Sequence, residues 1–435
     1  MTRNRFHRLL LLATLAAALH GLALVVTASR HLPSDSVTYL AEAHALLHGS
    51  YSTPTQGLGV LAPDLSRTPG YPLLLAAAGG GGAGWSRGLV YAYQLLLLAA
   101  TVWIAGLLFR RLWGPSVALL AVFLYALDPF SKRYAALILT ENLVTFMVVA
   151  TAYAFTRAAQ ERSAWWWTAS GLLSGAAILV RPAFAIAVPL GVVASFVLAK
   201  SPRRLRLEAA GAFLVGALLV LSPWLIRNTT VVGKPVLASW GAGESVLFGA
   251  YGEGYKRPVN VILTDPGFAH DFRDMSYPGF YPPKAELVRH PDLRARTEIA
   301  VDSQLRKQGR HVYRTRLTSD PAAVLGPYAY RVYFLWAAHD DLDQPQYRGL
   351  RLLALELVVW TSLLLAVAGA VLALRRRGPG AGLVAFMVVY TLSAALVHVE
   401  PRYSIPLRPL FFGLVGLALV EAYRRWSPAA RRARS

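Results

Sequence analysis

The sequence of 435 residues contains no cysteine. A chain without cysteine has no disulfide framework, no thiol nucleophile and no thiolate metal site. Charged residues are also scarce, at 15% of the chain, whereas 55% of the residues are hydrophobic. This composition excludes an ordinary soluble domain and is typical of an integral membrane protein.

Acidic residues are the scarcer of the two charged classes, with 23 Asp and Glu against 44 Lys and Arg and a formal net charge of +21. In a soluble chain this excess would indicate nucleic-acid binding. Here the basic residues form short clusters between apolar segments, which is how orientation is encoded in a bilayer. We therefore expect the lipid bilayer as a partner, and no nucleic acid.

Long apolar segments predict an all-α polytopic membrane protein with about ten transmembrane helices, because roughly 20 apolar residues cross the hydrocarbon core. The spans are expected at Leu9–Ala28, Gly88–Phe109, Ser116–Leu127, Asn142–Ala159, Trp165–Val180, Pro182–Ala199, Ala209–Ile226, Leu350–Leu374, Gly382–Val397 and Ile405–Tyr423. The third is short unless it continues past Asp128, and only Arg181 separates the fifth from the sixth, so a re-entrant or broken pair is possible there. A cleaved signal peptide is the alternative for the first segment, but its length and the lack of a clear A-x-A site favour an anchor.

The distribution of positive charge predicts one orientation for all spans. With a cytoplasmic N-terminus, every inward loop is rich in Lys or Arg, as the positive-inside rule requires. These loops are Arg110–Arg111, Arg157–Arg162, Lys200–Arg206, Arg375–Arg377 and the tail Arg424–Arg434. Both termini are therefore predicted to be cytoplasmic, and the two longest loops extracytoplasmic.

The loop lengths predict the domain organisation. Residues 1–226 are expected to form a catalytic transmembrane module with a first outer loop at 29–87, followed by an extracytoplasmic cap region at 227–349. Residues 350–423 are the C-terminal helices and 424–435 a basic cytoplasmic tail. Loops as long as 227–349 are usually functional or separately folded, and we expect short helices there, notably at Pro291–Leu317. The glycine-rich run at Gly79–Gly84 is expected to be a flexible connector.

The first outer loop carries an acid and an arginine. Asp35 stands in the first turn of a predicted amphipathic helix, where it can also serve only as a cap or as a partner of the helix dipole. Arg67 precedes a Pro-Gly-Tyr-Pro turn that includes Tyr71. A lone arginine at this position can equally be a snorkelling anchor.

Further polar residues lie at the predicted outer ends of the spans. Glu141 begins the fourth span and can complement its dipole, or can bind ligand. Arg181 interrupts an apolar stretch and is expected either to contact ligand or to pair with Glu141, because ionisable groups at membrane depth are usually paired or functional. Arg227 stands at the mouth of the seventh span, before a glycine-rich run without a phosphate-loop signature. His398, Glu400, Arg402 and Tyr403 follow the ninth span.

These residues fall on one side of the membrane by the predicted topology. A pocket with one or two carboxylates among several guanidiniums suits a substrate whose leaving group is a lipid phosphate. One carboxylate can then remove a proton from an acceptor, while the cations stabilise the departing charge. No ligand spacing argues for a metal. We predict no cofactor, and a divalent metal stays possible without support from the sequence.

The order of the motifs resembles that of a known family. It runs D-x-x-x-Y-x-x-x-A, R-x-P-G-Y-P, L-T-E, L-x-R-P, P-W-x-x-R-N and R-Y-x-x-P-x-x-P, over Asp35 to Asn228 and again over His398 to Pro409. In this order the motifs are similar to those of bacterial members of the protein O-mannosyltransferase and aminoarabinose transferase family. These are C-type membrane glycosyltransferases that use polyprenyl-phosphate sugars.

The resemblance implies an inverting, single-displacement transfer of a sugar at the outer face of a bacterial plasma membrane. It makes Asp35 the general base and gives Glu141 a role in positioning donor or acceptor. Arg67 and Arg227 match positions expected near the lipid phosphate, with Arg181 and Arg402 as helpers. Tyr71 and Tyr403, from the same motifs as Arg67 and Arg402, are grouped with these donor-binding residues.

One departure from the family concerns the acceptor. Protein mannosyltransferases often carry a second acid beside the first, and Ser36 occupies that position here. The expected donor is a polyprenyl-phosphate-linked sugar, whereas a lipid, a glycan and a protein all remain candidate acceptors. The main rival hypothesis is a transporter or flippase of a lipid-linked or anionic substrate, which would carry charges deeper within its spans. A noncatalytic scaffold or a polymerase-like protein is the third hypothesis.

Overall fold

The structure is a computed structural model of the chain, and it describes residues 1–27, 32–55, 58–65, 67–82, 85–199, 202–236, 241–252, 282–337 and 350–427. Parts of the predicted segments lie outside these residues. They are positions 29–31, 56–57 and 66 of the first outer loop, 83–84 of its glycine-rich connector, 200–201 of an inward loop, 237–240, 253–281 and 338–349 of the cap region, and 428–435 of the basic tail.

Apolar helices make up most of the described fold. Five are long and apolar enough to cross a membrane: α1 (Arg3–Thr27), α4 (Arg87–Trp113), α10 (Arg203–Val232), α17 (Leu350–Arg376) and the continuous pair η3 (Pro401–Leu407) and α19 (Arg408–Trp426). Four shorter apolar helices are α5 (Pro115–Leu127), α8 (Ala164–Val180), η2 with α9 (Pro182–Ile186 and Ala187–Leu198) and α18 (Pro379–Ala394). The predicted span Asn142–Ala159 lies within α7 (Glu141–Glu161). The prediction of a helical, polytopic membrane protein is thus confirmed, while the count of ten spans stays a prediction.

Two ambiguous spans have definite ends in the structure. The third does not continue past Asp128, because this residue is the N-cap of α6 (Pro129–Arg133) and its side chain accepts a hydrogen bond from the backbone N–H of Ser131. The fifth ends at Arg181, whose extended backbone (φ −147°) separates α8 from η2. Proline at the next position favours an extended residue here and ends the helix. The two spans are therefore a broken pair joined by a short 3₁₀ helix.

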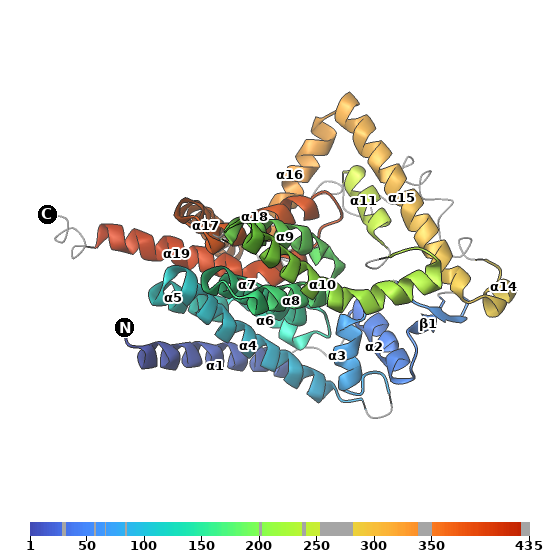
Figure 1. The fold of residues 1–435 in the computed structure, drawn as a ribbon, viewed down its shortest axis with the longest axis horizontal. Helices are drawn as coiled ribbons and strands as arrows, with labels where there is room; N and C mark the ends of the chain where they lie inside the picture. Colours follow the sequence, from blue (N-terminus) through green and yellow to red (C-terminus); the bar gives the residue numbers. More distant parts are fainter. Residues whose placement is uncertain are drawn as a thin grey trace.

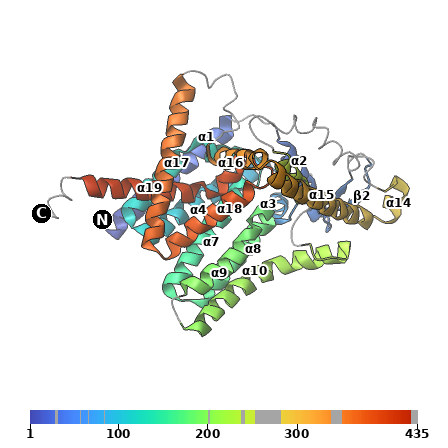
Figure 2. The same ribbon diagram turned by 90° about the horizontal axis from the view of Figure 1, so that it is seen from above.

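The apolar helices pack into one bundle, and the start of α1 and the end of α19 lie at the same end of it (Figures 1 and 2). Glycines allow the tightest approach, between α8 and α10. A Cβ added at Gly171 would lie 1.9 Å from the carbonyl oxygen of Phe213, and one at Gly216 would lie 2.2 Å from that of Thr168. Such small residues let the backbones of membrane helices come close.

The polar elements gather toward the end of the bundle opposite the termini (Figure 1). The first loop contributes α2 (Ser34–Leu47), the strands β1 (Ser52–Pro54) and β2 (Leu61–Pro63), and α3 (Gly70–Ala77). The cap region contributes α11 (Ala242–Ala250), α14 (Lys284–Arg289), α15 (Asp292–Ser319) and α16 (Ala322–Ala337). The helix expected at Pro291–Leu317 is therefore present as α15. A short 3₁₀ helix, η1 (Tyr134–Ala136), follows α6.

The two strands form an antiparallel hairpin that the sequence did not predict, in which Thr53 pairs with Ala62. The cap region fixes this hairpin through a buried arginine of α15. Nη1 of Arg294 donates to the carbonyl oxygen of Thr53 at 2.8 Å, and Nε donates to Oε1 of Glu298 at 2.9 Å. The first loop is thereby docked under the cap, which positions α2 for the site described next.

Candidate active site

Asp35 lies near the start of α2, but it does not cap the helix. Pro33 occupies the N-cap position and no side chain caps the helix there. The buried face of α2 carries Tyr39 and Glu42, so the helix presents Asp35 on the side that packs against the bundle. Its carboxylate is therefore available for partners from other parts of the chain.

Two guanidinium groups hold the Asp35 carboxylate, one on each oxygen. Nη2 of Arg67 donates to Oδ1 at 2.8 Å, and Nη1 of Arg402 donates to Oδ2 at 2.9 Å. The Arg67 guanidinium also lies over the Tyr39 ring, 5.7 Å from its centroid. Each carboxylate oxygen has two lone pairs. Asp35 therefore keeps acceptor capacity for a further proton donor.

Arg402 stands on η3, which joins the loop after α18 to α19. Its guanidinium also pairs with Glu400, and Nε lies 4.0 Å from Oε1 of Glu141. Burial raises the pKa of the Glu400 carboxyl, but the hydrogen bond from His398 and the charge of Arg402 outweigh it and lower the pKa to about 2. Arg402 thus sits among three carboxylates, with Asp35 as the third.

Glu141 and Arg181 form a second, more deeply buried ion pair. Glu141 is the first residue of α7 and its side chain is 1% exposed. Nη1 of Arg181 donates to its Oε1 at 3.0 Å. The Arg181 guanidinium also lies over the ring of Tyr403, 4.5 Å from the centroid. The pairing expected for Arg181 is therefore present, and it lies beside the Asp35 cluster.

These residues line one cavity of about 900 Å³, which we call the polar pocket. The first loop contributes Asp35 and Arg67, the ends of the bundle helices contribute Glu141, Arg181, Glu400 and Arg402, and the cap region covers them with Lys234, Asp302 and Arg306. Five cationic and four acidic side chains thus line the pocket. This near balance leaves a small excess of positive charge, which suits an anionic group of low charge.

Asp302 organises the cap side of the polar pocket. Its Oδ1 accepts hydrogen bonds from the backbone N–H groups of Gly241 and Gly243 at 2.8 and 2.7 Å, and its carboxylate also pairs with Arg306. This joins the start of α11 to α15. Sequence reasoning missed these residues, because their only sequence signal is an i, i+4 acid–arginine pair on a long polar helix.

Arg227 lies outside the polar pocket, although the sequence grouped it with the phosphate-binding residues. Its Nη1 donates to the carbonyl oxygen of Asp64, and its Nη2 to that of Tyr51, both at 2.8 Å. Its guanidinium also lies against the rings of Tyr51 and Trp224, 5.4 and 5.0 Å from their centroids. Arg227 thus clamps the first loop onto α10 instead of facing the pocket.

Tyr71 also lies behind the pocket, not on its wall. Its side chain is 1% exposed and packs edge-on against Tyr39, with 5.2 Å between the ring centroids. Its hydroxyl is buried and has no hydrogen-bond partner among the described residues. Tyr71 therefore supports Tyr39, which does line the pocket. Of the eight residues to which the sequence assigned catalytic or donor-binding roles, six line the pocket and two do not.

Metal ligands are a separate question. Among the described residues, no group of three or more His, Cys, Asp or Glu side chains could hold a metal ion. The four carboxylates of the polar pocket are engaged by arginines. The absence of a cofactor stays a prediction.

One part of the chain matches a protein family. Residues 82–226 match the family model described as dolichyl-phosphate-mannose-protein mannosyltransferase. The matched segment includes Glu141 and Arg181 of the polar pocket. For this third of the chain, the match confirms the resemblance that the motifs predicted. No curated protein matches the sequence.

The fold is similar to that of solved oligosaccharyltransferases. The apo form of the Archaeoglobus fulgidus oligosaccharyltransferase matches with a TM-score of 0.60 at 14% identity, over 99% of this chain and 52% of that chain. AglB from the same organism, in complex with an inhibitory peptide and a dolichol-phosphate, matches with a TM-score of 0.57 at 14% identity, over 98% and 52%. The chain thus spans about half the length of these proteins. At this identity the likeness shows the fold alone.

A third similar structure is ArnT from Cupriavidus metallidurans bound to undecaprenyl phosphate. It matches with a TM-score of 0.41 at 14% identity, over 98% of this chain and 80% of that chain. This TM-score is too low to add to the argument.

Proposed function

We propose that this protein is a membrane glycosyltransferase that moves a sugar from a polyprenyl-phosphate donor to an acceptor hydroxyl. The observation that carries the proposal is the Asp35 carboxylate held between Arg67 and Arg402 at the wall of the polar pocket. A carboxylate and guanidiniums in one pocket supply both a base and a cradle for a phosphate leaving group. The family match over residues 82–226 and the oligosaccharyltransferase fold support the same class.

The proposed reaction is a single displacement with inversion. The acceptor oxygen attacks the anomeric carbon from the face opposite the phosphate, the bond from that carbon to the phosphate oxygen breaks, and Asp35 takes the hydroxyl proton. The departing polyprenyl phosphate gains negative charge, since a diester becomes a monoester. Arg402 and Arg67 bind this developing charge, and Arg181 with Glu141 orients the donor beside them. Tyr403 supports Arg181 through its ring.

The small excess of positive charge in the pocket bears on the donor. A single phosphate group matches five cations and four carboxylates better than a diphosphate, which brings about one more negative charge. We therefore infer a monophosphate carrier. A comparison of the envelope lipids and glycans of a deletion strain with those of its parent identifies the sugar and the acceptor.

We further propose ten membrane spans with both termini in the cytoplasm and the polar pocket on the extracytoplasmic side of a bacterial plasma membrane. The start of α1 and the end of α19 lie at one end of the bundle, opposite α2 and α14 (Figure 1), and this supports the arrangement. The domain boundaries at residues 226, 349 and 423 belong to the same proposal. Because the chain has no cysteine, single cysteines placed at Ser50 and at Ser163 should react with an impermeant thiol reagent from opposite sides of the membrane.

Replacement of the proposed base tests the function. In native membranes, which supply the acceptor, and with a labelled polyprenyl-phosphate sugar, Asp35→Asn should lower the rate of transfer by about 10²- to 10⁴-fold, the range for a lost general base. The control is Asp292→Asn, which removes an acid from α15 away from the pocket. An Asp35→Asn protein that folds and transfers at the parental rate overturns the assignment of the base.

A further inference from the structure

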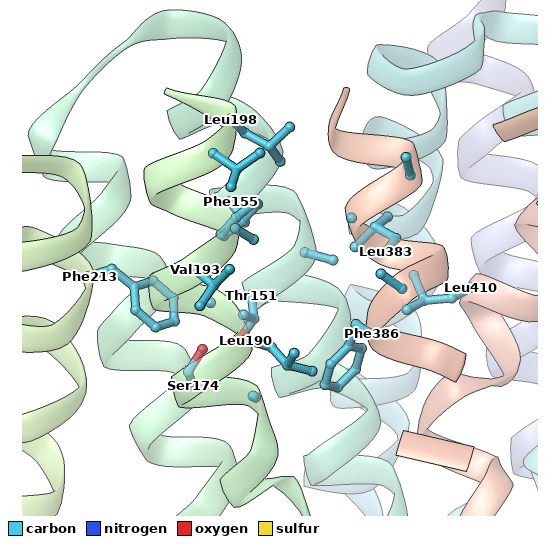
Figure 3. Close-up of a pocket in the computed structure, with 18 of the residues that line it drawn as sticks. Thr151, Phe155, Ser174, Leu190, Val193, Leu198, Phe213, Leu383, Phe386 and Leu410 are labelled. Carbon is cyan, nitrogen blue, oxygen red and sulfur yellow. The ribbon is translucent and has the colours of Figure 1, made fainter. Parts of the chain in front are cut away.

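A second cavity, of about 560 Å³, lies deeper in the bundle between α9 and α18 (Figure 3). We call it the apolar groove. Its walls are formed by apolar side chains such as Leu190, Val193, Leu383 and Phe386. The hydroxyls of Thr151 and Ser174 also line it, and neither has a hydrogen-bond partner among the described residues. A cavity of this chemistry accepts a hydrocarbon chain.

Aromatic side chains close the groove toward the polar pocket. The rings of Phe184 and Tyr390 stack with 4.9 Å between their centroids, and each side chain is 1% exposed. On the opposite side of this layer Arg181 and Tyr403 face the polar pocket. The groove and the polar pocket share no lining residue, so we infer that the occupant of the groove enters by another route.

The groove is open toward the surface that faces lipid. Val193 and Val197 of α9 both line it, and both are 61% exposed. Exposed apolar side chains on a bundle of apolar helices are in contact with the bilayer. A lipid chain can therefore enter the groove sideways, between α9 and α18.

The groove ends at a cation, far from the polar pocket. Along α7, Glu141 lines the polar pocket and Phe155 lines the groove, a separation of about 21 Å at 1.5 Å per residue. The last lining residues in this direction are Arg377 and Gly378, at the turn between α17 and α18. Arg376, the neighbouring cation, is paired with Glu421 at 2.7 Å. No such ion pair of Arg377 occurs among the described residues.

We propose that the apolar groove binds one chain of an anionic phospholipid whose phosphate is held by Arg377. A hydrocarbon groove that ends at a cation near the membrane surface matches a ligand with an apolar chain and an anionic headgroup. The lipid belongs to the leaflet on the Arg377 side, opposite the polar pocket. This inference does not depend on the proposed sugar transfer.

Native mass spectrometry of the full chain tests the site with defined lipids. The protein is purified in detergent and titrated with dioleoylphosphatidylglycerol, dioleoylphosphatidylcholine or a polyprenyl phosphate. We expect one tightly bound phosphatidylglycerol. Arg377→Gln should weaken it about fivefold, the contribution of one basic residue to an anionic lipid. Arg375→Gln, in the same exposed turn but not in the groove, should bind as the parent does.

A second pair of variants tests the groove without changing charge. Ala194→Phe fills the groove and should abolish the tight binding, whereas Val388→Phe, on exposed α18 surface outside the groove, should not. Circular dichroism and the melting temperature show whether each variant folds. If Ala194→Phe does not fold, the lipid affinity of Arg377→Gln alone tests the proposal. Equal binding of phosphatidylcholine, displacement by equimolar polyprenyl phosphate, or an unchanged affinity in Arg377→Gln each overturns the proposal.

Discussion

Arg402 and Asp35 stand 367 residues apart in the chain, and their side chains meet at 2.9 Å. The ion pair joins the first loop to η3, which leads into the last helix. Neither part of the chain can form the polar pocket without the other. The site is therefore a product of the whole fold, and it should respond to changes at both ends of the chain.

The first prediction concerns Arg402. Arg402→Gln should lower kcat/KM for sugar transfer by about 10²-fold, because it removes one preorganised cation from the leaving group. Arg402→Lys should recover only part of this activity, since a lysine cannot bridge Asp35 and Glu400 as the planar guanidinium does. Initial rates with a labelled polyprenyl-phosphate sugar measure both changes.

The matched control for Arg402 is Arg310→Gln, an exposed arginine of α15. It should keep the parental kcat/KM. Activity of Arg402→Gln within twofold of the parent would remove Arg402 from the reaction and leave it a structural partner of Asp35.

The second prediction concerns the buried acid Glu42 behind the pocket. Its side chain is fully buried, on the face of α2 that also carries Tyr39. Burial, and then the nearby charge of Asp64, raise the pKa of Glu42 to about 9 from an ordinary value of 4.5. The folded state therefore binds this proton more tightly than the unfolded state.

The sign of the effect on stability follows from this difference. The stabilisation is complete below pH 4.5 and is lost as the pH rises toward 9, by up to about tenfold in the folding equilibrium per pH unit. Glu42→Gln is neutral at every pH, so its melting temperature should fall less between pH 5.5 and 8.5 than that of the parent. Glu286→Gln, an exposed acid of α14, should follow the parental curve, and parallel curves for Glu42→Gln would refute the raised pKa.

The sequence predicted much of the pocket because motif residues at helix ends share one side of a membrane. Asp35, Glu141 and Arg402 are of this kind, and the structure brings them together. Arg227 and Tyr71 also belong to motifs near the ends of predicted spans, but their side chains do not line the pocket. Helical periodicity fixes where a span ends, whereas the direction of a long side chain depends on packing against distant segments. The hairpin under Arg294 was missed for the same reason, since its partners are more than 200 residues apart.

The third prediction follows from the clamp formed by Arg227. Its guanidinium holds two carbonyl oxygens of the first loop. Arg227→Ala should loosen this loop, so that limited proteolysis cuts within residues 50–65 several times faster than in the parent. The rate of sugar transfer should also fall, because the loosened loop no longer holds Asp35 in place. We expect kcat to fall by a larger factor than the KM for the donor rises. Protection of the loop equal to that of the parent would show that Arg294 suffices to dock it.

The fourth prediction concerns a buried charge cluster away from the polar pocket. Nη1 of Arg408 lies 3.3 Å from Oδ1 of Asp128, and the two side chains are 10% and 3% exposed. Lys132 is fully buried beside them, with its Nζ 3.4 Å from the centroid of the Tyr125 ring. Because Arg408 begins α19 directly after η3, the pair fixes the end of the element that carries Arg402.

Asp128→Asn should destabilise the protein by about 3–5 kcal/mol, because it leaves a buried guanidinium without its counter-charge. Asp128→Asn with Arg408→Met should recover part of the lost melting temperature, since the unpaired guanidinium is removed while the buried Lys132 still lacks its acidic neighbour. A transporter would transfer no sugar, in the parent or in either variant, whatever the stability of the protein. A glycosyltransferase needs the pair only to hold η3, so transfer should return together with stability. The melting temperature and the transfer rate, measured on the same preparations, therefore separate the two hypotheses.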